Sequence, residues 1–349
     1  MEKMTHPVAA SKLESSPASI TIGIDVSKDH LDASRHPGGE TIRVANTRKG
    51  QTALLRWIGD LTLVARVVFE PTGPYHRTLE ERLAGLGVVI IKVNPRQARC
   101  FAEATGRLAK TDRVDARMLA RYGALLEPVP RPIRSDLHND LAELVAARRS
   151  LMRDRTATLN RIKTLTIDIL KRHARHRLRQ IEAQVASLDA ALEALVAENE
   201  DLLRRREILI SIPGLGPVAA HTILADMPEL GTMEEGQAAS LAGLAPVTRQ
   251  SGTWRGKSLI RGGRATLRQA LYMPAIVAMR FNQDLKRVYD RLIAKGKHAK
   301  VAITAIMRKL VVLANALLRK DRLWTALLHN SVYWRDEAAI EFSITRPRV

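Results

Sequence analysis

The sequence is poor in cysteine and in aromatic residues. Cys100 is the one cysteine among 349 residues, and aromatic residues make up 4% of the chain. A single cysteine excludes an internal disulfide and any metal site built from several thiolates, which fits a reducing cytosol. Scarce aromatic residues argue against a surface that binds nucleic acid mainly by stacking its bases. Any contact with nucleic acid should therefore be mostly electrostatic.

Long hydrophobic runs are also missing. The longest stretch without a charged residue, 208–225, contains two prolines and two glycines, which a simple membrane-spanning helix would not carry. The first 18 residues are polar, rich in Ser and Pro, and lack the apolar run of a secretory signal. The sequence therefore predicts a flexible N-terminal arm, no membrane partner and a cytoplasmic location.

Acidic residues are outnumbered by basic ones. The chain has 36 Asp and Glu against 56 Lys and Arg, which gives a net charge of +20. Residues 249–300 hold 13 of these cations and only two acids, so more than half of the excess lies in this window. Such one-sided charge indicates a polyanionic partner, nucleic acid above all, although a solvated basic surface remains the simpler alternative. With 46% hydrophobic residues, the length predicts two or three domains.

The first 130 residues alternate short β-rich runs with amphipathic segments. The nearly apolar run 19–26 predicts a buried strand that ends at Asp25, and 63–69 predicts a second strand that ends at Glu70. The other elements predicted are strands at 31–34, 41–44 and 88–93, and helices at 47–58, 79–86 and 96–126. Because this order mixes hairpin connections with helical crossovers, it predicts a mixed sheet with helices packed on its faces.

The second half is predicted to be helical. Residues 135–206 contain no Gly and no Pro, and their apolar residues recur three and four apart. One helix of that length does not fit a compact domain, so we expect a hairpin that bends in the basic stretch 171–177. Its pattern suits a coiled coil within one chain or between two, and equally a simple spacer. The glycine-rich turn that follows, 211–217, resembles half of a helix-hairpin-helix, although an ordinary turn explains it as well.

Four carboxylates in the N-terminal half form a candidate metal site. Asp25 and Glu70 end predicted strands, while Asp112 and Asp115 lie three apart and so share one face of a helix. Taken singly, each fits a turn residue or a surface acid paired with a nearby cation. Together, in a basic protein without cysteine ligands, they match a site for Mg²⁺ or Mn²⁺, which prefer oxygen ligands. Paired ions of this kind assist phosphodiester cleavage.

Eight motifs carry a resemblance to a known family. In the first half they are GIDVSK at 23–28, FEPTGPY at 69–75, VNPRQARCFA at 93–102 and KTDRVDARMLA at 110–120. In the second half they are SIPGLGPVAAHTIL at 211–224, LAGLAP at 241–246, SGTWRGKS at 251–258 and RQALYMPA at 268–275. Over about residues 20–318 the chain resembles the DEDD transposases of bacterial insertion sequences of the one-ten family. Its first half also resembles the core of RuvC-type Holliday-junction resolvases.

The resemblance implies an α/β fold joined to an all-α one. We expect five parts: a flexible arm at 1–18, an RNase H-like (RuvC-like) mixed-sheet domain at 19–130, a long coiled-coil helical hairpin at 131–206, a helical C-terminal transposase domain with a helix-hairpin-helix-like element at 207–320, and a tail at 321–349. The tail carries no motif that indicates a function.

The resemblance also implies the site residues. It places the DEDD catalytic and metal-binding set on Asp25, Glu70, Asp112 and Asp115, and a nucleophilic serine on Ser251. Tyr272, the other hydroxyl in the basic window, is predicted to be a packing residue. Where some relatives have an acid before the serine, this chain has Gln250. The cations around the serine are candidates for contact with phosphate or RNA: Arg249, Arg255, Lys257, Arg261, Arg264 and Arg268.

The implied activity is DNA transposition through Mg²⁺-assisted strand cleavage and a covalent serine–DNA intermediate. Its implied partners are donor and target double-stranded DNA, a guide RNA encoded by the same element, and further copies of the chain in a dimer or tetramer. Two alternatives stay open. One is a RuvC-like, metal-dependent junction endonuclease in which Ser251 is inert, and the other is a catalytically dead regulator that binds nucleic acid.

Overall fold

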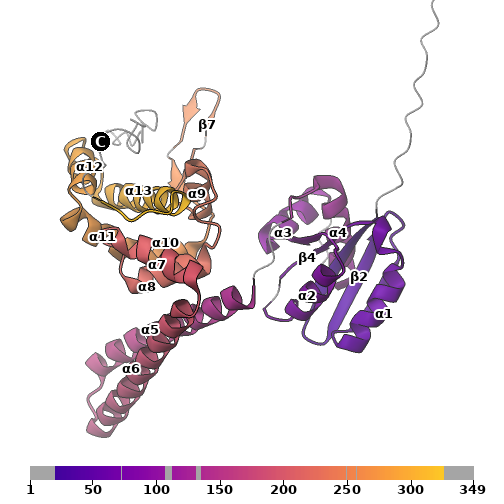
Figure 1. Cartoon of the computed structure of the whole chain (residues 1–349), viewed down its shortest axis with the longest axis horizontal. Coiled ribbons are helices and arrows are strands. Elements are labelled where there is room, and N and C mark those ends of the chain that lie inside the picture. The colour runs from indigo at the N-terminus through magenta and orange to yellow at the C-terminus, as the bar shows by residue number, and fades with distance from the viewer. Residues whose placement is uncertain are drawn as a thin grey trace, which may run out of the picture. The chain divides into compact units, whose positions relative to one another are not determined.

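The computed structural model describes residues 20–71, 73–106, 112–130, 135–248, 250–256 and 258–325, with the side chains of Asp112, Arg113 and Arg255 left out. The chain divides into two compact units, residues 1–133 and 134–349 (Figure 1). The first unit is a sheet covered by helices, and the second is almost entirely helical. This agrees with the predicted combination of an α/β part and an all-α part.

Five strands form the sheet of the first unit, in the order β3-β2-β1-β4-β5. Their bounds are β1 (Ile20–Val26), β2 (His30–His36), β3 (Thr41–Ala45), β4 (Val64–Phe69) and β5 (Ile90–Lys92). The first three strands are antiparallel neighbours, whereas β4 and β5 run parallel to β1. The mixed sheet predicted from the sequence is confirmed, and its order is consistent with an RNase H-like core.

Helices pack on both faces of this sheet. One face is covered by α1 (Arg48–Ile58) and α2 (Arg77–Gly85), whose buried leucines share a core with Ile22 and Ile24 of β1. A short 3-10 helix, η1 (Leu61–Leu63), precedes β4. Those of the other face are α3 (Pro95–Ala104) and α4 (Asp112–Leu126). The segment 96–126, predicted to be helical throughout, is thus two helices. The first ends at a turn in which Gly106 adopts φ 74°, a conformation that favours glycine.

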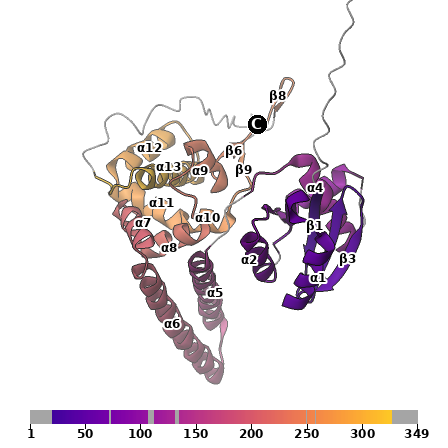
Figure 2. The same ribbon diagram turned by 45° about the vertical axis from the view of Figure 1, so that its right-hand side comes forward.

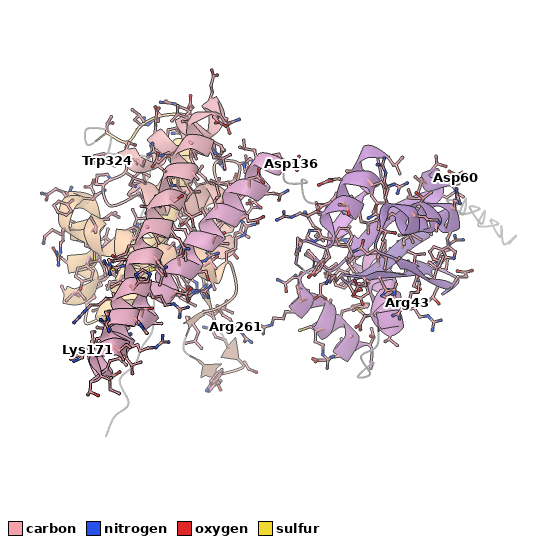
Figure 3. The ribbon with its side chains drawn as sticks, turned by 90° about the horizontal axis from the view of Figure 1, so that it is seen from below. Arg43, Asp60, Asp136, Lys171, Arg261 and Trp324 are labelled. Carbon is pink, nitrogen blue, oxygen red and sulfur yellow. The ribbon has the colours of Figure 1, made fainter. Side chains whose placement is uncertain are left out.

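The second unit begins with a helical hairpin, α5 (Asp136–Thr164) and α6 (Asp168–Ala197) (Figure 2). The ion pairs Arg148–Asp189 and Arg155–Glu182 join its two arms. The predicted bend at 171–177 is wrong, because the chain turns at 165–167 and Lys171 already lies near the tip within α6 (Figure 3). The basic stretch is rich in good helix formers whose charges remain solvated, so nothing in it breaks a helix.

Seven further helices pack around one large core: α7 (Glu200–Ser211), α8 (Pro217–Asp226), α9 (Glu235–Leu241), α10 (Ala265–Ala270), α11 (Tyr272–Phe281), α12 (Gln283–Ala294) and α13 (Ala299–Arg319). In the described part of the chain, α13 alone is long and apolar enough to cross a membrane. Its apolar side chains form the centre of this core, however, and the buried Asn315 side chain bonds to Gly231 N and Met233 O. Core packing therefore accounts for its composition.

The turn between α7 and α8 is packed into the same core. Gly214 adopts φ 104°, and a Cβ there would lie 2.7 Å from the carbonyl oxygen of Pro274 on α11. The positive φ and the lack of space for a side chain thus explain this glycine, and an ordinary tight turn would have the same requirements. The likeness to a helix-hairpin-helix stays a prediction.

A short β-ribbon extends from the helices of this unit (Figure 1). It consists of β6 (Pro246–Val247), β7 (Gln250–Ser251), β8 (Trp254–Arg255) and β9 (Leu259–Ile260). β6 pairs with β9, and β7 pairs with β8, both antiparallel. The sequence predicted helices with a basic loop here, because strands of two residues are too short to produce a detectable alternation.

Candidate active site

Two of the predicted site residues lie at the carboxyl ends of neighbouring parallel strands, Asp25 as the last residue but one of β1 and Glu70 directly after β4. Ile24 of β1 is in register with Phe69 of β4. The next residues, Asp25 and Glu70, therefore occupy adjacent positions at one edge of the sheet, on strands that lie about 4.8 Å apart. Both are half-buried.

Helix α4 lies directly on the face of β1 that Asp25 shares with Gly23. A Cβ on Gly23 would lie 2.2 Å from both Ala116 O and Ala120 N, while one on Gly123 would lie 2.9 Å from Cγ2 of Thr21. Thr21 of β1 thus lies next to Gly123 of α4, and Gly23 lies next to Ala116, which is earlier in the helix. The helix therefore runs antiparallel to the strand. Two strand residues span about 6.6 Å and a helical turn about 5.4 Å, so this antiparallel alignment brings the start of α4 over Asp25.

Replacement of Gly23 by alanine is expected to displace α4, because the added Cβ has no space against the helix backbone. We expect a loss of about 2 kcal/mol or more in the local stability of β1 and α4, at the upper end of overpacking costs. Hydrogen exchange of peptides from these two elements measures it. Gly85→Ala is the matched control, because its Cβ would meet nothing within 4 Å and its φ is not positive. Equal exchange in both variants would contradict the close contact.

The start of α4 carries the other two predicted carboxylates. Asp112 is its first residue, and the half-buried Asp115 follows in the same turn. The four residues thus come from two strand ends and one helix start, and they supply the oxygen donors that Mg²⁺ and Mn²⁺ prefer. Among the side chains that the structure describes, which do not include that of Asp112, no three His, Cys, Asp or Glu residues form a metal-binding group. The register of β1 with β4 and the packing of α4 on β1 bring the backbone of these positions to one edge of the sheet.

A fifth carboxylate, which the sequence analysis missed, lies beside Asp25. Asp32 of β2 is directly opposite Asp25 and is 4% exposed. Arg43 of β3 donates two parallel bonds to it, Nε to Oδ1 at 2.9 Å and Nη2 to Oδ2 at 2.8 Å. This bidentate pair neutralises the buried charge. An acid between the apolar residues Leu31 and Ala33 of a predicted strand was the signal that could have revealed it.

A buried polar cluster lies on the other side of Glu70. Glu80 of α2 is 5% exposed and forms an ion pair with Lys92, with 2.5 Å between Nζ and Oε1, while the Nε2 atom of His76 lies 3.5 Å from its second oxygen. Burial lowers the pKa of His76, and the charge of Glu80 opposes that shift. The His76 ring also packs on Phe69, at 5.7 Å between centroids. The cluster therefore ties α2 and β5 to the strand end that precedes Glu70.

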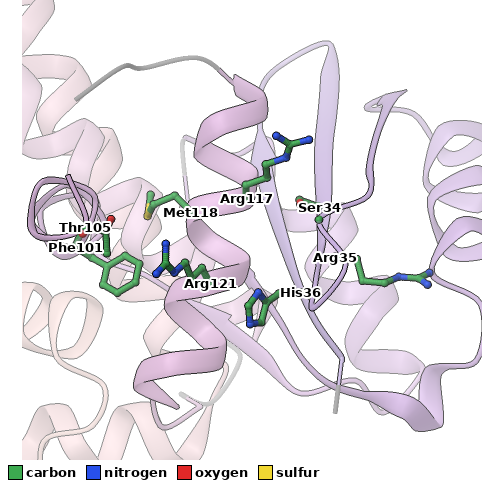
Figure 4. A pocket seen from close by; sticks show the side chains of 9 residues that line it. Ser34, Arg35, His36, Phe101, Thr105, Arg117, Met118 and Arg121 are labelled. Atoms are coloured by element: carbon green, nitrogen blue, oxygen red, sulfur yellow. Dashed lines mark hydrogen bonds between the residues drawn. The ribbon is translucent and has the colours of Figure 1, made fainter. Parts of the chain in front are cut away.

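A pocket of about 130 Å³ lies next to α4 and is lined by nine residues, Ser34, Arg35, His36, Gly39, Phe101, Thr105, Arg117, Met118 and Arg121 (Figure 4). None of them is acidic. Arg35 is occupied, since it donates to Trp57 O and Ile58 O and lies over the Trp57 ring. Arg117 and Arg121 are exposed, one helical turn apart, and without an ion pair among the described residues. The pocket therefore offers two uncompensated cations.

Ser251 lies in the second unit, at the tip of the β-ribbon. It is exposed and immediately precedes the two-residue turn Gly252-Thr253, in which Gly252 has φ 56°. Its cross-strand partner is Trp254. The hydroxyl is thus accessible, and it belongs to a different unit from the four carboxylates.

The six predicted phosphate-contacting cations differ in their surroundings. Arg261 is exposed near the foot of the ribbon (Figure 3). Arg264 forms two bonds of 2.8 Å with Glu229, and Arg268 donates to the carbonyl oxygens of Gly243 and Gly262. In the free chain these two guanidinium groups thus form intramolecular bonds between separate segments of the second unit. The structure does not describe Arg249 and Lys257, and it leaves out the side chain of Arg255.

Two further residues with polar side chains, Tyr272 and His221, lie on helices of the second unit. Tyr272 begins α11 and is 40% exposed, so the prediction that it is a packing residue is wrong. His221 of α8 is buried between Arg206, at 3.3 Å, and Glu193, at 3.8 Å. Burial lowers its pKa, with Glu193 opposing the shift. This histidine is part of the helical core.

Two family models and several curated relatives match the chain. Residues 22–169 match the IS110-type DEDD transposase model, and residues 206–290 match the model described as "Transposase IS116/IS110/IS902 family". The pilin gene-inverting protein of Moraxella bovis is 30% identical over 321 residues, which are 88% of this chain and 98% of that protein. Its counterpart in Moraxella lacunata matches equally. An uncharacterized 43.6 kDa protein of insertion element IS110 from Streptomyces coelicolor is 29% identical, over 58% of this chain and 51% of that protein.

Proposed function

Because the chain belongs to the IS110 family of DEDD transposases, we propose that it cleaves and exchanges DNA strands at the ends of an insertion sequence through a covalent serine–DNA intermediate. The observation that carries this proposal is the convergence of Asp25, Glu70 and the start of α4 at one edge of the sheet. The pilin gene-inverting name of the Moraxella relative supports recombination rather than simple hydrolysis, since inversion requires cut strands to be rejoined.

Transposases of the DEDD type use divalent metal ions. In this chain the residues that would hold Mg²⁺ or Mn²⁺ are Asp25, Glu70, Asp112 and Asp115. A bound ion of this kind neutralises phosphate charge and lowers the pKa of an attacking oxygen. Asp32 lies next to this set, but both of its carboxylate oxygens are already paired with Arg43.

Ser251 supplies the nucleophile in this proposal. Its Oγ–H bond breaks as Oγ bonds to a DNA phosphorus, the bond from that phosphorus to a deoxyribose oxygen breaks, and the leaving oxygen takes up a proton. The resulting phosphoserine ester keeps the energy of the broken phosphodiester, so a hydroxyl of another strand can displace the serine without an external energy source. An exposed serine beside a tight turn can approach a duplex without steric hindrance.

The proposal includes the partners implied by the resemblance. They are donor and target duplexes, a guide RNA encoded by the element, and further copies of the chain in a dimer or tetramer. The carboxylates and the serine belong to different units of the chain, which is compatible with a reaction in which they come from different copies. We expect the protein to act in the bacterial cytoplasm on nucleoid DNA.

The double variant Arg117→Ala/Arg121→Ala is expected to weaken binding of nucleic acid and to reduce its salt dependence. Each lost phosphate contact lowers the slope of log K against log salt by about 0.9, so we expect a change of nearly 2. Titrations with labelled DNA between about 50 and 200 mM salt measure this slope. Arg56→Ala/Arg99→Ala removes the same charge from α1 and from an arginine already paired with Glu103. An identical change in both variants would assign the effect to net charge alone.

One reaction tests the proposed function as a whole. Purified protein is incubated with Mg²⁺, labelled donor and target duplexes, and RNA transcribed from the flanking non-coding region. The products are separated by denaturing electrophoresis with and without protease treatment. A DNA band that is retarded only without protease supports the serine intermediate. Free nicked DNA and no retarded band would indicate the RuvC-like endonuclease, and binding without either product would indicate the regulator.

A further inference from the structure

The β7–β8 hairpin places an aromatic ring beside the proposed nucleophile. Ser251 and Trp254 are direct cross-strand partners, so their side chains share one face with Cβ atoms about 4.5–5.5 Å apart. The turn between them has two residues, with positive φ at Gly252 and not at Thr253, which is the pattern of type II′ hairpins. This compact turn fixes the indole next to the hydroxyl.

The Trp254 indole is largely in solvent. The residue is 59% exposed, in a chain where aromatic residues make up only 4%. Single exposed apolar side chains need no partner in general, and Phe281 of α11, 72% exposed, is another in this unit. Trp254 differs from Phe281 because it shares a ribbon face with the serine that the proposed reaction uses.

The charge of the ribbon indicates what covers this ring. Residues 246–263 contain four cations, Arg249, Arg255, Lys257 and Arg261, and no acid. Cations that follow a phosphate backbone, combined with an aromatic ring for a base, form the usual surface for an unpaired nucleic acid strand. An apolar protein surface would leave these charges without compensation. The complementary partner is therefore a DNA strand rather than a second copy of the chain.

We propose that Trp254 binds a nucleobase, by stacking its indole on a base of the DNA strand next to the phosphodiester that Ser251 attacks. This inference rests on the proposed serine chemistry. Exchange of strands requires bases near the cut to leave their pairs, and a stacked ring stabilises such a base. The same stack holds the adjacent phosphate at a fixed distance from Oγ, which is an orientation effect on the rate.

The stacking contact is tested by measuring adduct formation by Trp254 variants on DNA duplexes that lack single bases. A series of duplexes carries one abasic nucleotide at successive positions around the cut. On intact DNA, Trp254→Ala is expected to lower adduct formation about 10-fold, the loss typical of one base–aromatic stack. On the duplex that lacks the stacked base, wild type and Trp254→Ala should react equally. Trp254→Phe should retain most of the rate, Trp254→Leu should behave as the alanine variant, and Phe281→Ala should behave as wild type.

Binding measured in a Ser251→Ala background separates this inference from the serine chemistry. If Ser251 is not the nucleophile, wild type forms no adduct, yet affinity must still show the coupling between Trp254 and one base position. The inference is overturned if Trp254→Ala costs nothing, or if its loss is the same on every abasic duplex. A change in sedimentation of the protein alone in Trp254→Ala would also overturn it, in favour of a contact between copies.

Discussion

Changing Asp25 to asparagine is expected to lower DNA cleavage by about a thousandfold or more, while affinity for DNA stays nearly unchanged. Asparagine preserves the size of the side chain but removes the charge that a divalent cation requires. Asp25 occupies the sheet position next to Glu70 and beneath the start of α4, so the substitution would remove one of the four proposed metal ligands. Asp32 cannot substitute for it, because Arg43 already binds both of its carboxylate oxygens.

The measurement is single-turnover cleavage in Mg²⁺ and in Mn²⁺, together with the melting temperature of each variant. Asp115→Asn should show the same loss. Asp29→Asn is the matched control, because Asp29 is an exposed acid in the loop between β1 and β2. Its cleavage rate should equal that of wild type. If Asp25→Asn cleaves at the wild-type rate with unchanged dependence on metal, the sheet edge is not the catalytic centre.

Changing Ser251 to alanine is expected to remove the covalent protein–DNA adduct completely. The exposed hydroxyl at the tip of the ribbon is the group that bonds to phosphorus in the proposed reaction, and alanine leaves the hairpin and its Gly252 turn intact. The retarded, protease-sensitive band should therefore vanish while DNA affinity persists. Ser258→Ala, a serine on the same ribbon between β8 and β9, should retain the band.

The two substitutions together distinguish the candidate functions. Adduct lost in both Asp25→Asn and Ser251→Ala is expected for a serine recombinase that depends on metal. Metal-dependent nicks that survive in Ser251→Ala would reject the serine intermediate and support the junction endonuclease. If wild type and both variants bind DNA with an affinity that depends on salt but form no product, the chain is a binding protein.

Local sequence signals were sufficient for much of the first unit. The buried runs before Asp25 and Glu70 form β1 and β4, because continuous apolar segments of this length are stable only with both faces covered. Thr47, the first residue of the helix predicted at 47–58, caps α1 by accepting a hydrogen bond from Gly50 N. These features depend on a few neighbouring residues, so no knowledge of distant contacts was needed.

Other features were invisible in the sequence. The hairpin of α5 and α6 turns at 165–167 and not in 171–177, because charge alone does not break a helix whose side chains reach solvent. Whether a cation is available for nucleic acid also depends on tertiary contacts. Arg264 and Arg268 look the same in sequence as Arg261, yet they bond to Glu229 and to two carbonyl oxygens across the fold.

The sequence by itself therefore determined the strands of the first unit, the family and the four carboxylates of the DEDD motif, since each is encoded in a run of consecutive residues. Only the tertiary structure decided which segments pack against one another. The contact of Gly23 with Ala116 and Ala120 sets α4 over the sheet edge, and the register of β7 with β8 sets Trp254 beside Ser251. Both depend on backbone packing between segments, and a linear pattern does not contain the distances that such packing creates.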